Sequence, residues 1–201
     1  AKPNVVIFNS SEDEFAAIGD EWQNPLYPTQ REGLLRILES LRSWDGKFHV
    51  YLRMHPNLRN VDNEDTRGLL KLSAPFLTVL PPDSPVSTYD LIEKADRVLS
   101  FGSTVGIEAV YWGTPSISAG LSFYRGLGGT YDPDSHEELM ALLKAELTPK
   151  DRTAALMFGY YYATYGVRYA NYRATSVTRG VFREQVLPPP SLIGKLVLGA
   201  R

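Results

Sequence analysis

The sequence contains no cysteine. Its 201 residues therefore cannot form a disulfide, a thiolate metal site or a cysteine nucleophile, and a reducing, cytoplasmic compartment fits this composition. There is also no run of about 18 apolar residues, the length that a membrane-spanning helix requires. These absences favour a cytoplasmic protein that folds around an ordinary hydrophobic core.

A strong charge of either sign is absent as well. The formal net charge is -2, and no basic face is evident, so we expect no nucleic-acid partner. A mild basic cluster between Arg168 and Arg183 is interpreted as a solvated helix face. The alternative is contact with a sugar acid or with an anionic lipid surface, and the latter would place the protein peripherally at the inner face of the cell membrane.

Short apolar runs alternate with helical patterns along the first 148 residues. This alternation is typical of βαβ units and predicts an α/β fold, with a Rossmann-like parallel sheet and flanking helices. In the first helix, the apolar residues Leu34, Leu35, Leu38 and Leu41 are expected on one face. The expected strands cover residues 5–8, 48–54, 77–80, 97–101 and 115–118, and the expected helices cover residues 30–44, 64–72, 88–95, 104–112 and 135–147.

The C-terminal part of the chain differs in composition. Residues 149–172 are predicted to form one long helix, unusually rich in tyrosine. We interpret it as an amphipathic helix that packs on the sheet edge or on a neighbouring domain, with an aromatic platform that stacks on sugars as the alternative. The chain is therefore expected to have a Rossmann-like domain at residues 1–148 and a C-terminal helical extension at residues 149–201.

At residues 100–109 a strand runs directly into a glycine-flanked turn and a helix. The hydroxyls of Ser103 and Thr104, the unpaired N–H groups of the helix start and the positive end of its dipole suit a phosphate. Gly106 would let the helix start approach a ligand closely. Glu108, one turn beyond Thr104, could accept hydrogen bonds from ribose hydroxyls. The alternative is a plain helix cap, but the capping-box spacing is absent.

A second candidate group follows the strand that ends near residue 54. Arg53 and His55 share one face of this strand, and Asn57 follows them. The carboxyl ends of parallel strands lie at one edge of a sheet, where open α/β sheets bind their ligands. We therefore predict that Arg53, His55 and Asn57 bind a nucleotide or phosphate at the same edge as the Ser103 turn.

The remaining polar candidates follow the first strand. Ser10 and Ser11 are predicted to lie at the same edge and to contact the nucleotide. Glu12 and Glu14 are weak candidates for a catalytic role, because a run of carboxylates in a loop is usually solvated. No histidine or cysteine completes a metal ligand set there, so we expect no metal. The other histidines are expected to be structural: His49 and His136.

These motifs resemble the C-terminal region of bacterial capsule and surface-polysaccharide biosynthesis proteins. The resemblance covers roughly residues 4–145, and its most specific parts are the His-Pro and Ser-Thr elements. It implies a GT-B glycosyltransferase, in which two Rossmann-like domains face each other and the C-terminal one holds the nucleotide-activated sugar. The residues that carry it are residues 8–14, Gln30, residues 53–57, residues 103–109 and residues 112–115.

Several functional expectations follow from this resemblance. In relatives that use CMP-sugar donors, such as the Kdo transferases, a His-Pro and a Ser-Ser/Thr motif contact the nucleotide. This implies that His55, Ser103 and Thr104 bind the donor phosphate and that Glu108 lies close by. No bound metal or cofactor is implied. The general base and a saccharide or glycolipid acceptor site would belong to a missing N-terminal domain, so this chain is expected to bind a donor without being a complete enzyme.

Three alternative functions remain open at this point. A CDP-glycerol-type glycerophosphotransferase also pairs a His-Pro motif with a serine-rich helix start. A UDP-GlcNAc 2-epimerase has a related architecture. The third alternative is a non-catalytic nucleotide-binding or interaction module, whose tyrosine-rich helix and apolar tail would dock a partner.

Overall fold

The computed structural model describes residues 2–11, 24–44, 47–176 and 179–187. The chain divides into two compact units, Ala1–Tyr161 and Tyr162–Arg201. Within the described part of the chain, no helix is both long enough and apolar enough to cross a membrane.

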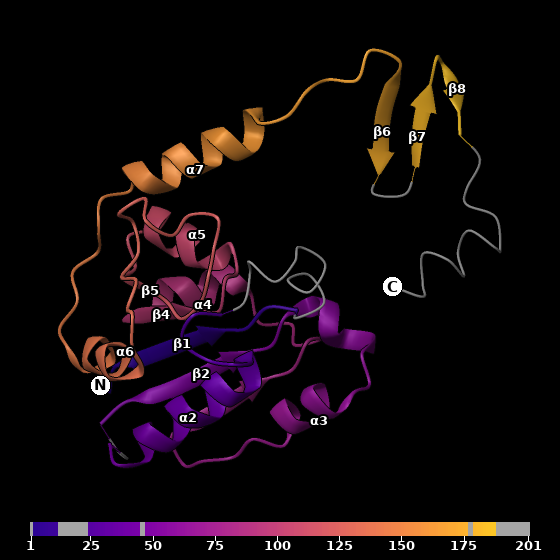
Figure 1. Ribbon diagram of the computed structural model, residues 1–201. Coiled ribbons are helices and arrows are strands. Elements are labelled where there is room, and N and C mark those ends of the chain that lie inside the picture. Colours follow the sequence, from indigo (N-terminus) through magenta and orange to yellow (C-terminus); the bar gives the residue numbers. More distant parts are fainter. Residues whose placement is uncertain (1, 12–23, 45–46, 177–178, 188–201) are drawn as a thin grey trace. The chain divides into compact units, whose positions relative to one another are not determined.

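A parallel five-stranded sheet forms the centre of the first unit, in the order β3-β2-β1-β4-β5 (Figure 1). Ile7 in the central strand is aligned with Leu52 on one side and with Leu99 on the other, and all three side chains are fully buried. This confirms the predicted Rossmann-like α/β fold. The strands are β1 (Asn4–Phe8), β2 (His49–Arg53), β3 (Leu77–Leu80), β4 (Arg97–Ser100) and β5 (Ser116–Ser118).

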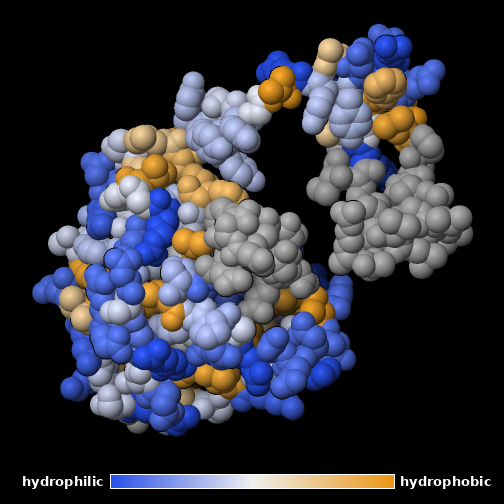
Figure 2. Space-filling view, viewed as in Figure 1, coloured by the Kyte–Doolittle hydropathy of each residue, from blue (hydrophilic) through white to orange (hydrophobic). Residues whose placement is uncertain are grey.

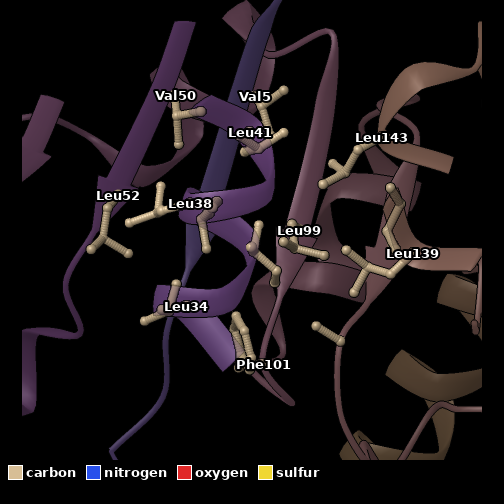
Figure 3. Packing of buried hydrophobic residues seen from close by; sticks show 14 of the residues in the cluster. Val5, Leu34, Leu38, Leu41, Val50, Leu52, Leu99, Phe101, Leu139 and Leu143 are labelled. Atoms are coloured by element: carbon tan, nitrogen blue, oxygen red, sulfur yellow. The ribbon is translucent and has the colours of Figure 1, made fainter. Parts of the chain in front are cut away.

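Two helices cover one face of this sheet, α2 (Gln30–Arg42) and α6 (His136–Lys144). Figure 3 shows leucines of both helices directed at Val5, Val50, Leu52 and Leu99 of the strands. The expected apolar face of α2 needs one correction. Leu35 is 42% exposed, whereas Ile37 is fully buried, because 3.6 residues per turn align positions 34, 37, 38 and 41.

The opposite face of the sheet is covered by α4 (Thr88–Lys94) and α5 (Val105–Tyr111). Ile92 of α4 and Ala109 of α5 pack there against buried strand residues. The connection from β2 to β3 contains a short 3-10 helix, η2 (Pro56–Asn60), and α3 (Glu64–Leu70). The sheet is thus buried on both faces, as its continuous apolar strands require.

The tyrosine-rich segment does not form one long helix. The helix α7 covers Thr153–Thr164, and Gly166 then adopts a φ of +109°, a left-handed backbone conformation that ends helices. Only Ala154 and Phe158 of α7 are buried, against α5 and Tyr124. In Figure 2 tan and orange residues gather over the first part of α7, where Leu156 and Met157 are more than half exposed. The described part of α7 therefore lacks the expected pattern of one buried and one polar face.

Beyond α7 the second unit contains a three-stranded antiparallel sheet, in the order β6-β7-β8. Its strands are β6 (Tyr172–Ser176), β7 (Arg179–Phe182) and β8 (Gln185–Val186). The tight turn between β7 and β8 places Arg183 and Glu184 at positive φ, as two-residue hairpins require. The helix expected over residues 165–172 is absent. Residues 165–171 form no regular element, and Tyr172 begins β6, where a tyrosine suits the strand conformation.

Candidate functional site

A cavity of about 250 Å³ opens at the carboxyl ends of the central strands. The chain places β2 and β3 on one side of β1 and returns to place β4 and β5 on the other side. Such a switch in strand order leaves a crevice beyond β1 and β4, the usual ligand site of open α/β sheets. We call this the switch-point cavity. Its wall includes Asn9, Arg53, His55, Tyr89, Ser103 and Glu108.

His55 is held at this cavity by the end of β1 and by η2. Its backbone N–H donates to Oδ1 of the buried Asn9 at 2.8 Å. Its Nδ1 accepts from the N–H of Asn57 at 3.2 Å. Because Nδ1 acts as an acceptor, the neutral ring carries its proton on Nε2. Nε2 has no hydrogen-bond partner among the described residues, so it can donate to a ligand in the cavity.

Arg53 is nearly buried, with 7% exposure, and forms part of the cavity wall. Its guanidinium donates to the backbone carbonyls of Pro81 and Ser84, in the loop after β3. Its Nε is buried and has no partner among the described residues. Burial and the nearby Arg59 lower the pKa of Arg53. Arg53 therefore fixes the loop after β3 and contributes positive charge at the cavity.

Ser103 lies in the turn between β4 and α5, and its carbonyl is bound twice. The hydroxyl of Tyr124 donates to this carbonyl at 2.6 Å, and the N–H of Gly106 donates to it at 3.0 Å. The Ser103 hydroxyl accepts a long bond from the N–H of Val105, at 3.4 Å. Its own hydrogen can therefore be donated to a ligand. Fewer N–H groups at the start of α5 are free to bind a ligand than the sequence predicted. The N–H of Val105 already donates to the Ser103 hydroxyl, and that of Gly106 donates to the Ser103 carbonyl.

Thr104 and Glu108 share one side of α5, as their spacing predicted. The Thr104 hydroxyl donates to Oε1 of Glu108 at 3.0 Å, and the Tyr89 hydroxyl donates to Oε2 at 3.0 Å. Glu108 and Tyr89 line the switch-point cavity, but Thr104 does not. Because its hydroxyl is directed at Glu108, Thr104 orients a carboxylate in this structure. Its contact with phosphate stays a prediction.

Gly106 faces the interior of the domain. A Cβ at this position would overlap the hydroxyls of Ser100 and Tyr124. The glycine is therefore required where α5 packs closely against β4 and Tyr124. Packing accounts for the glycine here, and the expected close approach of a ligand to the helix start stays a prediction.

The remaining predicted residues lie away from the switch-point cavity. Asn57 supports His55 through its backbone N–H and does not line the cavity. Ser10 and Ser11 are buried and line a second cavity, of about 140 Å³, next to α2 and α3. The Ser10 hydroxyl is already donated to the carbonyl of Phe101 at 2.6 Å. Two further candidates lie outside the described residues: Glu12 and Glu14.

Both histidines expected to be structural make internal hydrogen bonds. His49 bonds the Thr78 hydroxyl at 2.8 Å, and His136 bonds the hydroxyls of Tyr27 and Ser40 at 2.8 and 2.9 Å. Within the described ranges, no group of three histidine, cysteine, aspartate or glutamate residues could hold a metal ion.

Two tyrosines at the site were not predicted from the sequence. Tyr89 follows the Ser87 cap of α4, in the segment after β3. Because ligand sites lie beyond the carboxyl ends of strands, this position could have marked Tyr89 as a candidate. Tyr124 lies in a glycine-rich connection whose sequence gave no such signal. It is almost fully buried beneath the Ser103 turn, and burial raises its pKa to about 12.

The sheet order and the switch-point cavity define a Rossmann-like α/β domain. Residues 23–175 match the family described as "Capsule polysaccharide biosynthesis protein", which is most of the chain. The chain belongs to this family, as the sequence resemblance indicated. No curated protein matches the sequence significantly.

Solved structures similar to the chain include two from Thermosulfurimonas dismutans KpsC. The β Kdo 2,4 transferase has a TM-score of 0.48 and 15% identity, and the β Kdo 2,7 transferase has 0.47 and 24%. Each similarity covers 77% of this chain and 43% of the other. A UDP-GlcNAc 2-epimerase from Neisseria meningitidis has a TM-score of 0.39 and 17% identity, and the similarity covers 82% of this chain and 37% of that one. The chain thus spans less than half the length of each of these solved chains.

Proposed function

We propose that this chain is the donor-binding domain of a GT-B glycosyltransferase in capsular or surface polysaccharide biosynthesis. Its substrate is a nucleotide-activated sugar, with a CMP-sugar such as CMP-Kdo favoured. One observation carries the proposal: the switch-point cavity brings together His55 and Ser103, two of the three residues that the family resemblance associates with the donor phosphate. Membership of the capsule polysaccharide family supports the same reaction class.

The two side chains suit the leaving group of such a reaction. As the bond between sugar and phosphate breaks, negative charge grows on the phosphate oxygens. His55 Nε2–H and the Ser103 hydroxyl are fixed donors at the cavity, and the nearby Arg53 guanidinium adds positive charge. Donors that are oriented before the reaction stabilise developing charge at little reorganisation cost.

The saccharide or glycolipid acceptor and the general base are assigned to a second GT-B domain. The proposal therefore assigns donor binding to this chain and transfer to the longer enzyme. It includes a cytoplasmic location, at the inner face of the membrane when the acceptor is a lipid.

Isothermal titration calorimetry of the purified chain with CMP, CDP, UDP and GDP tests this function. At least one nucleotide should bind, and CMP is expected to bind best. The His55→Ala and Ser103→Ala variants should each weaken binding by about 1–3 kcal/mol, because each removes a hydrogen bond to a charged group.

His49→Ala is the matched control for the histidine variant. It removes an imidazole whose described hydrogen bond is to Thr78 and which does not line the cavity, so its nucleotide affinity should equal that of the unmodified chain. If no nucleotide binds to the folded chain, the proposed function is wrong. If the His55→Ala and His49→Ala variants bind the nucleotide equally well, His55 has no part in nucleotide binding.

A further inference from the structure

Tyr89 and Thr104 together fix the carboxylate of Glu108. Each donates a hydrogen bond of 3.0 Å, Thr104 to Oε1 and Tyr89 to Oε2. The bond to Glu108 raises the pKa of Tyr89 above its usual value, so the phenol stays protonated and remains a donor at neutral pH. A carboxylate oxygen can accept a second hydrogen bond. Glu108 can therefore still accept from a ligand, in an orientation that Tyr89 has set.

The charge of Glu108 determines which part of a nucleotide can lie next to it. A carboxylate repels phosphate and only accepts hydrogen bonds. In the nucleotide complex proposed above, the phosphate must then lie toward His55 and Ser103, and the group near Glu108 must carry donors. The hydroxyls of a ribose meet this requirement.

The ring of Tyr89 is available at the same end of the cavity. Tyr89 is 53% exposed although it lines the cavity, and Trp112 beside it is 59% exposed. Their ring centroids are 6.0 Å apart, with 53° between the ring planes. Exposed aromatic rings offer flat surfaces on which a nucleobase can stack.

From these observations we infer that Tyr89 recognises the nucleoside part of the donor. Its hydroxyl positions Glu108 for the ribose hydroxyls, and its ring stacks on the base. This inference rests on the proposed function. The inference predicts that Tyr89 discriminates a nucleotide from a simple sugar phosphate. His55 and Ser103 bind the phosphate that both ligands carry, so they do not discriminate between them.

Calorimetry with three ligands and three variants tests the two roles separately. The ligands are CMP, 2′,3′-dideoxy-CMP, which lacks both ribose hydroxyls, and ribose 5-phosphate, which lacks the base. Tyr89→Phe removes the hydroxyl and keeps the ring, whereas Tyr89→Leu removes both. Tyr111→Leu is the control, because Tyr111 contacts the same Trp112 ring at 5.8 Å without lining the cavity.

Tyr89→Phe should weaken CMP binding by roughly three- to tenfold and leave dideoxy-CMP unchanged, since only CMP offers hydroxyls to Glu108. Tyr89→Leu should weaken both nucleotides by about fivefold or more, the usual effect of a lost stacking contact. Ribose 5-phosphate has no base to stack, so Tyr89→Leu should weaken its binding no more than Tyr89→Phe does. Tyr111→Leu should bind all three ligands as the unmodified chain does, and circular dichroism should show every variant folded.

The possible failures are distinguishable. If the unmodified chain binds none of the nucleotides, the proposed function fails and this inference with it. If it binds CMP, but Tyr89→Leu keeps the original ratio of CMP to ribose 5-phosphate affinity, stacking on Tyr89 is disproved. An equal effect of Tyr89→Phe on CMP and dideoxy-CMP would disprove the positioning of Glu108.

Discussion

The effect of Gly106→Ala depends on whether helix propensity or packing dominates at this position. Gly106 lies in the first turn of α5, where replacing glycine by alanine gains about 1 kcal/mol from backbone propensity alone. In this structure the new Cβ would overlap the hydroxyls of Ser100 and Tyr124. Inserting a methyl group into a packed interior costs about 1–3 kcal/mol.

A further loss comes from the hydrogen bonds at the same place. Ser100 Oγ and the Tyr124 hydroxyl are 3.1 Å apart, and Tyr124 also donates to the Ser103 carbonyl. Displacing Tyr124 should cost about 1 kcal/mol for each bond lost. Packing therefore outweighs propensity, and the net effect should be a destabilisation of about 1–3 kcal/mol.

Urea unfolding followed by circular dichroism measures this difference, and a thermal melt should show a decrease in Tm of about 2–4 °C per kcal/mol. Gly159→Ala in α7 is the matched control. A Cβ there meets nothing within 4 Å, so that variant should be unchanged or more stable by up to about 1 kcal/mol. If Gly106→Ala is as stable as Gly159→Ala, the packing argument is refuted.

Two further predictions concern buried tyrosines. Tyr124→Phe should lower the free energy of unfolding by about 1–2 kcal/mol, because the phenol bonds both Ser100 and the Ser103 carbonyl; equal urea midpoints for the two proteins would contradict this. Burial raises the pKa of Tyr27 to about 12 from 10.0, so the folded state holds its proton more tightly than the unfolded state does. Stability linked to Tyr27 should therefore be complete below pH 10 and decrease as the pH rises from 10 to 12, and Tyr27→Phe should flatten that decrease in pH-dependent urea titrations.

Local sequence patterns predicted most of the elements of the first unit. Strand β3 was predicted at residues 77–80, where it lies, and the other strands of its sheet and the α-helices from α2 to α6 were placed within a few residues of their ends. This was possible because a parallel strand buried on both faces requires a continuous apolar run, and a helix on the sheet requires an apolar stripe. Beyond residue 164 the same reasoning was wrong, because Gly166 adopts a left-handed conformation that ends helices and Tyr172 begins a strand that pairs with β7.

The sequence by itself determined the fold class, the family and the edge of the sheet at which a ligand site would form. Parallel strands bring their carboxyl ends to one edge whatever their order, so His55 and Ser103 could be expected near each other. Only the tertiary structure decided which side chains share the cavity. It directs Thr104 to Glu108 and Gly106 into the interior, and it separates Ser10 and Ser11 into a second cavity. It also adds Tyr89 to the switch-point cavity and places Tyr124 beneath the Ser103 turn. These assignments depend on how α4, α5 and the loops pack on the sheet, and that packing is set by contacts between segments far apart in the chain.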